Sequence, residues 1–237
     1  MIARRTLLAT AAAFALFAAL PAPAARAGEE PYITAKTLDL MNFLPPPPVA
    51  GSAEDMADRA AVVAAQKAAG PERVALAQHD AEETIYVMFD KVMGDKFKAE
   101  ALPLTSKLFT RLGESEDATI DPVKPAYGRV RPYLAAPEEI KAQVKASKSG
   151  SYPSGHTTRV TLSAIVLSAM VPEKRAEIWA RADEYAWSRV VGGMHYPRDL
   201  DGGRRAGTAM AATAFADAKF QADFAAARAE LRAALGL

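Results

Sequence analysis

The chain has 237 residues, no cysteine, and 29 basic against 28 acidic side chains, which gives a formal net charge of +1 at pH 7. Without cysteine it forms neither disulfides nor a thiolate metal site, and this excludes a small disulfide-stapled scaffold. The near-neutral balance lacks the basic excess typical of nucleic-acid-binding proteins, so we expect no nucleic-acid partner. The length suffices for one domain with a buried core.

The first 27 residues have the features of a secretory signal peptide. Arg4-Arg5 precedes an uncharged apolar stretch from Thr6 to Leu20, and Ala25-Arg26-Ala27 offers small residues for cleavage. We therefore predict cleavage after Ala27 and a periplasmic mature protein. Export could follow either the general secretory route or the twin-arginine route. Cleavage would remove three arginines and no acid, which leaves 26 basic and 28 acidic side chains and a net charge of −2. An uncleaved membrane anchor is the alternative, but the apolar stretch is short for a span of about 20 residues.

Residues 28–51 form a different kind of segment, centred on Pro45-Pro46-Pro47-Pro48. Proline has no amide hydrogen to donate and favours the extended polyproline II conformation. We therefore predict an irregular arm that lies on the surface or on a neighbouring subunit. This arm and the alanine-rich helices that follow lead us to expect a homo-oligomer.

Residues 52–237 are predicted to be one helical domain. Apolar residues recur at helical spacing, and no segment shows the alternation of a β-strand. The fold class is therefore all-α, a single compact domain whose functional residues lie on loops and helix ends of a helix-bundle core. The predicted helices are Ser52–Ala69, Pro71–Met93, Ala99–Leu112, a short helix from Pro137, His156–Met170, Pro172–Val191, Asp199–Ala216 and Ala218–Leu235. The apolar stretch from Leu162 to Val171 is too short to cross a bilayer, so we expect no stable membrane insertion.

Three short segments of the chain contain candidate functional residues. The first contains two cations, and the second lies at the start of a predicted helix. Lys124 and Arg131-Pro132 lie in a loop interrupted by proline and glycine, where two cations alone could be solvated charges. Pro153-Ser154-Gly155-His156 begins a predicted helix, whose free amides and dipole favour an anion, and Gly155 lets that anion approach the backbone. A simple cap by Ser154 is the alternative. A serine-hydrolase elbow is disfavoured because Tyr152 stands where that pattern has glycine.

The third segment contains Ser188-Arg189, His195 and Asp199. Asp199 follows His195 by four residues, so its carboxylate could accept a hydrogen bond from the imidazole Nδ1–H and leave the other nitrogen as a nucleophile. Arg189 offers a planar pair of donors for two phosphate oxygens. The alternative is a surface arginine beside a chance His–Asp pair. The third histidine, His79, lies among polar residues on a predicted helix and is assigned a structural role.

The order and spacing of the three segments are more specific than any one of them. Lysine, six residues and Arg-Pro are followed after 20 residues by Pro-Ser-Gly-His, and after 31 more by Ser-Arg, five residues, histidine, three residues and aspartate. This pattern resembles the three-part signature of the type 2 phosphatidic-acid phosphatase superfamily. The run Gly-Ser-Tyr-Pro-Ser-Gly-His-Thr, the signal peptide and the proline-rich arm resemble the class A bacterial non-specific acid phosphatases, over essentially the whole mature chain.

That resemblance implies a metal-independent acid phosphatase that hydrolyses small-molecule phosphomonoesters, without a cofactor, through a phosphohistidine. Phosphotransfer to other alcohols is an implied side activity. The implied nucleophile is His195, oriented by Asp199, and the implied acid and base is His156. The implied phosphate-binding residues are Lys124, Arg131, Ser154, Gly155 and Arg189. Because His156 must be protonated while His195 is not, we expect a bell-shaped pH dependence with an acidic maximum.

Three alternatives remain at this stage. Vanadium-dependent haloperoxidases resemble the same superfamily and hold vanadate with the same residues, but they are usually much longer. A non-catalytic periplasmic phosphate-binding protein would need only cations and amides, which leaves both histidines and the aspartate without a purpose. A membrane lipid phosphatase is disfavoured by the lack of a predicted spanning helix in the mature chain.

Overall fold

The computed structural model describes residues 30–237, and this part of the chain contains helices and no β-strand. The all-α prediction is confirmed, whereas the predicted signal peptide lies outside the described residues. The α-helices are α1 (Ala53–Ala68), α2 (Pro71–His79), α3 (Ile85–Met93), α4 (Pro103–Ile120), α5 (Lys124–Tyr127), α6 (Pro132–Ala135), α7 (Gly155–Met170), α8 (Arg175–Val191), α9 (Pro197–Ala216) and α10 (Ala218–Leu235). Short 3₁₀ helices lie at Leu40–Asn42, Ala99–Ala101 and Pro172–Lys174.

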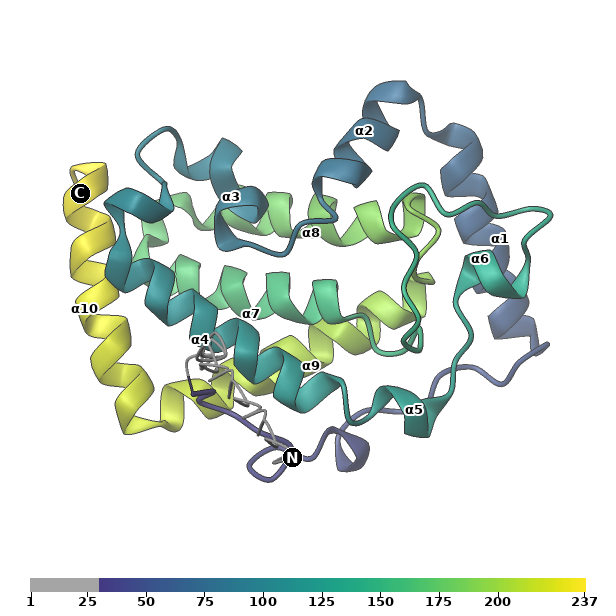
Figure 1. Cartoon of the computed structure of the whole chain (residues 1–237), viewed down its shortest axis with the longest axis horizontal. Coiled ribbons are helices and arrows are strands. Elements are labelled where there is room, and N and C mark those ends of the chain that lie inside the picture. The colour runs from purple at the N-terminus through teal and green to yellow at the C-terminus, as the bar shows by residue number, and fades with distance from the viewer. Residues whose placement is uncertain (1–29) are drawn as a thin grey trace, which may run out of the picture.

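Helix α7 is the centre of the fold (Figure 1). It packs against α8 on one side, α9 on the other and α4 in front, and α10 closes one end of the bundle against α4 and α9. Most of its side chains are buried, including Val160, Val166 and Met170, as expected for a helix that is covered all round. None of the helices between residues 30 and 237 combines the length and apolar composition that a bilayer span requires.

Two glycines let α9 approach the first turns of α7 very closely. A Cβ atom on Gly203 would lie 2.7 Å from the Ser154 carbonyl oxygen, and one on Gly207 would lie 2.6 Å from the Thr158 carbonyl oxygen. Both distances are shorter than a normal contact, so a side chain at either position would push the two helices apart. The close packing places the N-terminal ends of α7 and α9 side by side, which is where two of the three sequence segments meet.

The prediction of one helix over Pro71–Met93 was wrong, because the chain breaks between α2 and α3. Asp80 is fully buried at this break, and its carboxylate accepts hydrogen bonds from Arg181 and from the Ser188 hydroxyl. Thr84 then caps α3 by accepting from the Val87 amide. These polar contacts outweigh the helical periodicity, and they leave residues 81–83 as a short strap that crosses the N-terminal end of α7.

The remaining helix predictions differ in accuracy. The helix predicted from Ala99 to Leu112 begins later and ends later, since Pro103 occupies the first turn of α4. The short helix predicted from Pro137 was wrong: the chain forms a turn there, after the four-residue helix α6. Helices α7, α8, α9 and α10 lie within three residues of their predicted bounds.

The proline-rich arm lies against the helical body. Ile33, Leu40 and Leu44 are buried. The arm is also held by two tyrosine hydroxyls, since Tyr152 donates to the Pro45 carbonyl at 2.7 Å and Tyr127 donates to the Leu44 carbonyl at 3.1 Å. These contacts connect the arm to α5 and to the loop that precedes α7.

Candidate active site

A cavity of about 200 Å³ lies at the N-terminal end of α7. Six of the eight site residues predicted from the sequence line it, namely Lys124, Arg131, Gly155, His156, Arg189 and His195. The other two, Ser154 and Asp199, are fully buried and support lining residues from behind. His79 is not among the lining residues, and its half-exposed side chain contacts Asp80 instead. The three sequence segments therefore converge on one place.

The N-terminal turn of α7 presents donors to this cavity. Ser154 is the N-cap, and its Oγ accepts hydrogen bonds from the amide and the hydroxyl of Thr157. The Ser154 carbonyl accepts from the Thr158 amide, so the Gly155 and His156 amides are the first-turn donors left for a ligand. The capping role and the anion-binding role of this segment are therefore compatible.

Among the cations that line this cavity, Arg189 has the fewest hydrogen-bond partners within the described residues. Its guanidinium is buried, and its Nε and Nη1 atoms have no hydrogen-bond partner among the described residues. Burial lowers the pKa of Arg189 to about 10, so the side chain still carries its charge at neutral and acidic pH. Because unpaired buried donors are costly, two of them on one cation that lines a cavity indicate a site built for an oxyanion.

Arg131 is fully engaged, and one of its bonds identifies the state of His195. The guanidinium donates to the carbonyl oxygens of Ser149, Gly150 and Met194 and to the Ser149 hydroxyl. Its Nη1 also lies 3.1 Å from His195 Nε2. A guanidinium only donates, so Nε2 must carry a lone pair.

The other ring nitrogen of His195 is protonated for the same kind of reason. Nδ1 lies 2.8 Å from the Ser151 carbonyl oxygen, which only accepts. The sequence hypothesis gave this hydrogen bond to Asp199, but the Asp199 carboxylate is 3.5 Å from Nδ1 and contributes as a near charge. Burial, followed by the charges of Arg131 and Arg189, holds the pKa of His195 well below its usual value. His195 is therefore a neutral imidazole whose Nε2 lone pair accepts from Arg131.

Asp199 is the anchor of the loop that carries His195. Its carboxylate accepts from Arg129 at 2.6 Å, from the Ser151 hydroxyl at 2.6 Å and from the Tyr196 amide at 2.8 Å. Burial raises the pKa of Asp199 to about 6, and these three donors oppose that shift. The carboxylate thus fixes Ser151, whose carbonyl in turn holds His195.

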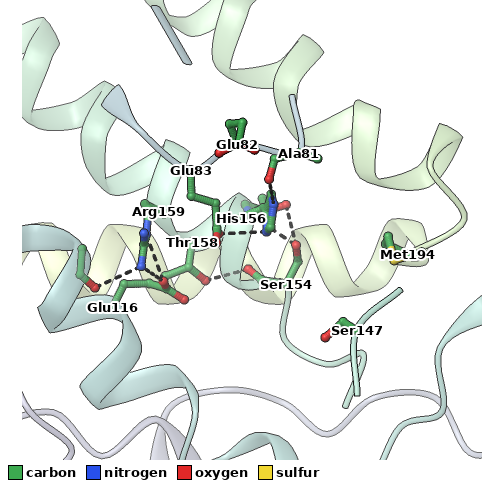
Figure 2. Close-up of polar contacts among 12 residues, drawn as sticks. Ala81, Glu82, Glu83, Glu116, Ser147, Ser154, His156, Thr158, Arg159 and Met194 are labelled. Carbon is green, nitrogen blue, oxygen red and sulfur yellow. Dashed lines mark hydrogen bonds and ion pairs between the residues drawn. The ribbon is translucent and has the colours of Figure 1, made fainter. Parts of the chain in front are cut away.

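His156 has different partners on both ring nitrogens (Figure 2). Nδ1 lies 2.8 Å from Glu83 Oε1, and Nε2 lies 3.2 Å from the Ala81 carbonyl oxygen, both from the strap between α2 and α3. Burial lowers the pKa of His156 and Arg189 adds to this, whereas Glu83 and the Ala81 carbonyl raise it. Burial alone would raise the pKa of Glu83, but its contact with His156 lowers it to about 2, so Glu83 is an anion.

Several residues that support the site were not predicted from the sequence. Arg129, which pairs with Asp199, Asp58 and Asp55, occupies a variable position between Lys124 and Arg131. Glu83 lies on the strap that was predicted to be helical. Glu116 on α4 lines the cavity beside Gly155, and no spacing in the sequence relates it to the three segments.

Comparison with known proteins identifies the family of this chain. The PAP2 superfamily profile matches residues 113–222, which contain all three segments. The chain is 34% identical over 193 residues to a non-specific acid phosphatase of Providencia stuartii, with 78% of each chain covered. It is also 34% identical over 202 residues to the non-specific acid phosphatase of Salmonella typhimurium, covering 80% of this chain and 78% of the relative. An acid phosphatase of Zymomonas mobilis is 30% identical, covering 83% and 76%. The chain belongs to the PAP2 superfamily, and within it to the non-specific acid phosphatases.

The fold has a counterpart among solved structures. The transmembrane PAP2-type phosphatidylglycerolphosphate phosphatase from Bacillus subtilis matches with a TM-score of 0.53 and 19% sequence identity. The match covers 78% of this chain and 93% of that one. At this identity the likeness concerns the helical fold alone.

Proposed function

We propose that this protein is a periplasmic acid phosphatase that hydrolyses phosphomonoesters through a phosphohistidine on His195, without a metal ion. The observation that carries the proposal is the pair of unpartnered donors on buried Arg189, in the same cavity as a neutral histidine whose Nε2 holds a lone pair. Names and identities of the relatives support the phosphatase activity. Periplasmic location, the covalent intermediate, metal independence and a homo-oligomeric state come from the sequence interpretation.

In the proposed first step, the phosphate group occupies the cavity and its oxygens accept from Arg189, Lys124 and the amides of Gly155 and His156. The Arg131 hydrogen that points at Nε2 turns to a phosphate oxygen, which frees the lone pair. Nε2 then forms a bond to phosphorus while the bond to the alcohol oxygen breaks. The fixed cations and amides stabilise the charge on the phosphoryl oxygens, which is the main requirement of phosphoryl transfer.

In the proposed proton transfers, His156 protonates the departing alcohol oxygen. We assign this proton to Nε2, because its contact with the Ala81 carbonyl is the longer of the two, while Glu83 holds Nδ1. The neutral His156 then takes a proton from water, whose oxygen attacks phosphorus and releases inorganic phosphate from His195. Phosphate release restores both histidines, so the cycle is closed.

The nucleophile is tested by His195→Ala with p-nitrophenyl phosphate as substrate. Turnover should fall by about 10⁴-fold or more, because the covalent route is lost. His79→Ala is the matched control, since this half-exposed histidine lies outside the cavity, and it should retain turnover. Wild-type turnover in His195→Ala would sink the assignment.

The intermediate and the metal independence need separate measurements. Rapid quenching with substrate labelled at phosphorus should trap an acid-labile, alkali-stable phosphoprotein in the wild type and none in His195→Ala. A phosphate-binding protein would give no label, so this experiment also excludes the non-catalytic alternative. Prolonged EDTA treatment should leave turnover unchanged, and a loss that added metal restores would contradict the metal-independent mechanism. N-terminal sequencing of exported protein should begin at Gly28.

A further inference from the structure

A buried carboxyl group stands inside this cavity and has no role in the mechanism above. Glu116, on α4, is 3% exposed and lines the cavity together with Lys124, Arg189 and His195. An acid in a pocket that binds a phosphate dianion would be unfavourable if it were ionised, since like charges repel at close range.

The two carboxyl oxygens of Glu116 have different surroundings (Figure 2). Oε2 accepts from the Nε and Nη2 atoms of Arg159 at 3.1 and 2.8 Å. Oε1 lies against the first residue of α7: a Cβ atom on Gly155 would be 2.8 Å from Oε1 and 3.4 Å from Lys124 Nζ. Oε1 and Lys124 Nζ thus both lie beside Gly155, whose amide the proposed mechanism assigns to a phosphate oxygen.

Four charged groups act on this carboxyl group from the surrounding elements. Arg159 of α7 and Lys124 of α5 favour its ionised form, whereas Glu83 of the strap and the neighbouring Asp117 favour its protonated form. Arg159 also donates to Asp117, so its charge is divided between two acids. Burial is the largest influence and raises the pKa of Glu116 to about 7. As the pH falls below this pKa, the neutral carboxylic acid, which has a hydrogen to donate, becomes the dominant form.

We propose that Glu116 is a proton-dependent phosphate-binding residue. Protonated, it donates a hydrogen bond from Oε1 to a phosphate oxygen; ionised, it repels the phosphate group, so that substrate affinity falls as the pH rises. A carboxylic acid kept neutral by its surroundings in order to donate a hydrogen bond is an established device in enzymes. The inference rests on the proposed phosphate site and adds a residue that makes this site selective for acidic conditions.

The direct test is Glu116→Gln, with the KM for p-nitrophenyl phosphate measured from pH 5 to pH 9. Glutamine keeps the shape and can still accept from Arg159 while it donates an N–H, but it does not ionise. If only the protonated wild type binds, its affinity falls about tenfold one pH unit above the pKa. We therefore expect equal KM values, within about threefold, at pH 5.5, and a roughly tenfold lower KM for the variant at pH 8, with little change in kcat. Glu114→Gln, the same change on the same helix but outside the cavity lining, is the matched control.

Binding of inorganic phosphate, measured by calorimetry on the wild type and on Glu116→Gln, tests the same inference without turnover. Phosphate itself titrates in this range. The informative quantity is therefore the affinity of Glu116→Gln divided by that of the wild type at each pH. A ratio that rises with pH supports the inference even if the wild type proves inactive, in which case only the proposed function fails. A ratio that stays constant from pH 5 to pH 9, or the same change in Glu114→Gln, overturns the inference and leaves the phosphatase proposal standing.

Arg159→Gln provides a second variant in case Glu116→Gln folds poorly. Removing this cation takes away the main group that favours ionised Glu116, so its pKa should rise further. The pH at which KM begins to increase should then move upward. A variant that weakens binding by one factor at every pH would show that Arg159 acts only as a distant positive charge, and this result would contradict the role of Glu116.

Discussion

His195 and His156 line the same cavity near the ends of two adjacent helices, but the hydrogen-bond partners of their ring nitrogens differ. His195 has a carbonyl oxygen at one nitrogen and a guanidinium at the other, which requires one proton and one lone pair. His156 has an oxygen acceptor at both nitrogens, one of them a carboxylate, which favours two protons. In the proposed mechanism, the backbone and the charged groups around each histidine, more than the histidine itself, decide whether it attacks phosphorus or donates a proton.

This division also explains how one cavity could use histidine as a nucleophile in acid. An ordinary imidazole would be protonated at pH 5 and could not attack phosphorus. Burial and the nearby arginines hold the pKa of His195 well below its usual value, while Glu83 raises the pKa of His156. The following predictions alter one side of this comparison at a time.

The largest effect is expected from Arg131→Ala, which removes the guanidinium beside His195 Nε2. Loss of a phosphate-binding cation should lower kcat/KM by about 10²- to 10³-fold. Arg131 is also the charge that contributes most to the low pKa of His195, so this pKa should rise and the acidic limb of the pH–rate profile should move to higher pH. Arg131→Lys keeps the charge and serves as the control, with a limb close to that of the wild type. An unmoved limb in Arg131→Ala would show that burial alone keeps His195 neutral.

A smaller loss is expected from Asp199→Asn. If Asp199 itself fixed the tautomer of His195, the change should cost about 10⁴-fold, as tautomer loss does in serine proteases. The Ser151 carbonyl already accepts from Nδ1, so we expect less than about a 10²-fold drop in kcat. The melting temperature should fall as well, since buried Arg129 loses an anionic partner. A 10⁴-fold drop with an unchanged melting temperature would return the orienting role to Asp199.

Arg131 and Asp199 also show how much of the site the sequence could predict. The eight predicted site residues could be found because their order and spacing are fixed along the chain, and the structure places six of them in one cavity and two behind it. The partner of Nδ1 could not be found in this way, because it is a backbone carbonyl, which leaves no trace in residue identity.

The acidic residues Glu116 and Glu83 could not be predicted from the sequence for a different reason. Glu116 reaches Gly155 only because α4 packs across α7, and Glu83 reaches His156 only because buried Asp80 interrupts the helix that the periodicity predicted. Local pattern describes each helix well, as the accurate bounds of α7, α9 and α10 demonstrate. It does not describe which polar side chains the packing of those helices brings together.

On the other side of the comparison, Glu83→Gln should weaken His156 as an acid. Glu83 raises the pKa of His156, so its removal lowers that pKa and the acid form is lost at a lower pH. The alkaline limb of the kcat profile should move toward acid, with roughly a tenfold loss at pH 7, a fraction of the usual contribution of a general acid. Glu82→Gln, one residue away on the same strap, is the matched control. A limb that stays in place in Glu83→Gln would remove Glu83 from the mechanism.

The smallest effect concerns stability rather than rate. The folded pKa of His195 is below its unfolded value near 6.5, so the unfolded chain binds the proton more readily, and folding stability is lost as the pH falls below about 6.5. His195→Gln cannot be protonated in either state and should escape this loss. Between pH 7 and pH 5 its melting temperature should therefore fall by about 2–6 °C less than that of the wild type. His156→Gln should show a smaller difference, because Glu83 and the Ala81 carbonyl oppose the effect of burial there. Equal slopes for the two variants in a calorimetric pH series would mean that the two histidines are not held in different protonation states by the folded protein.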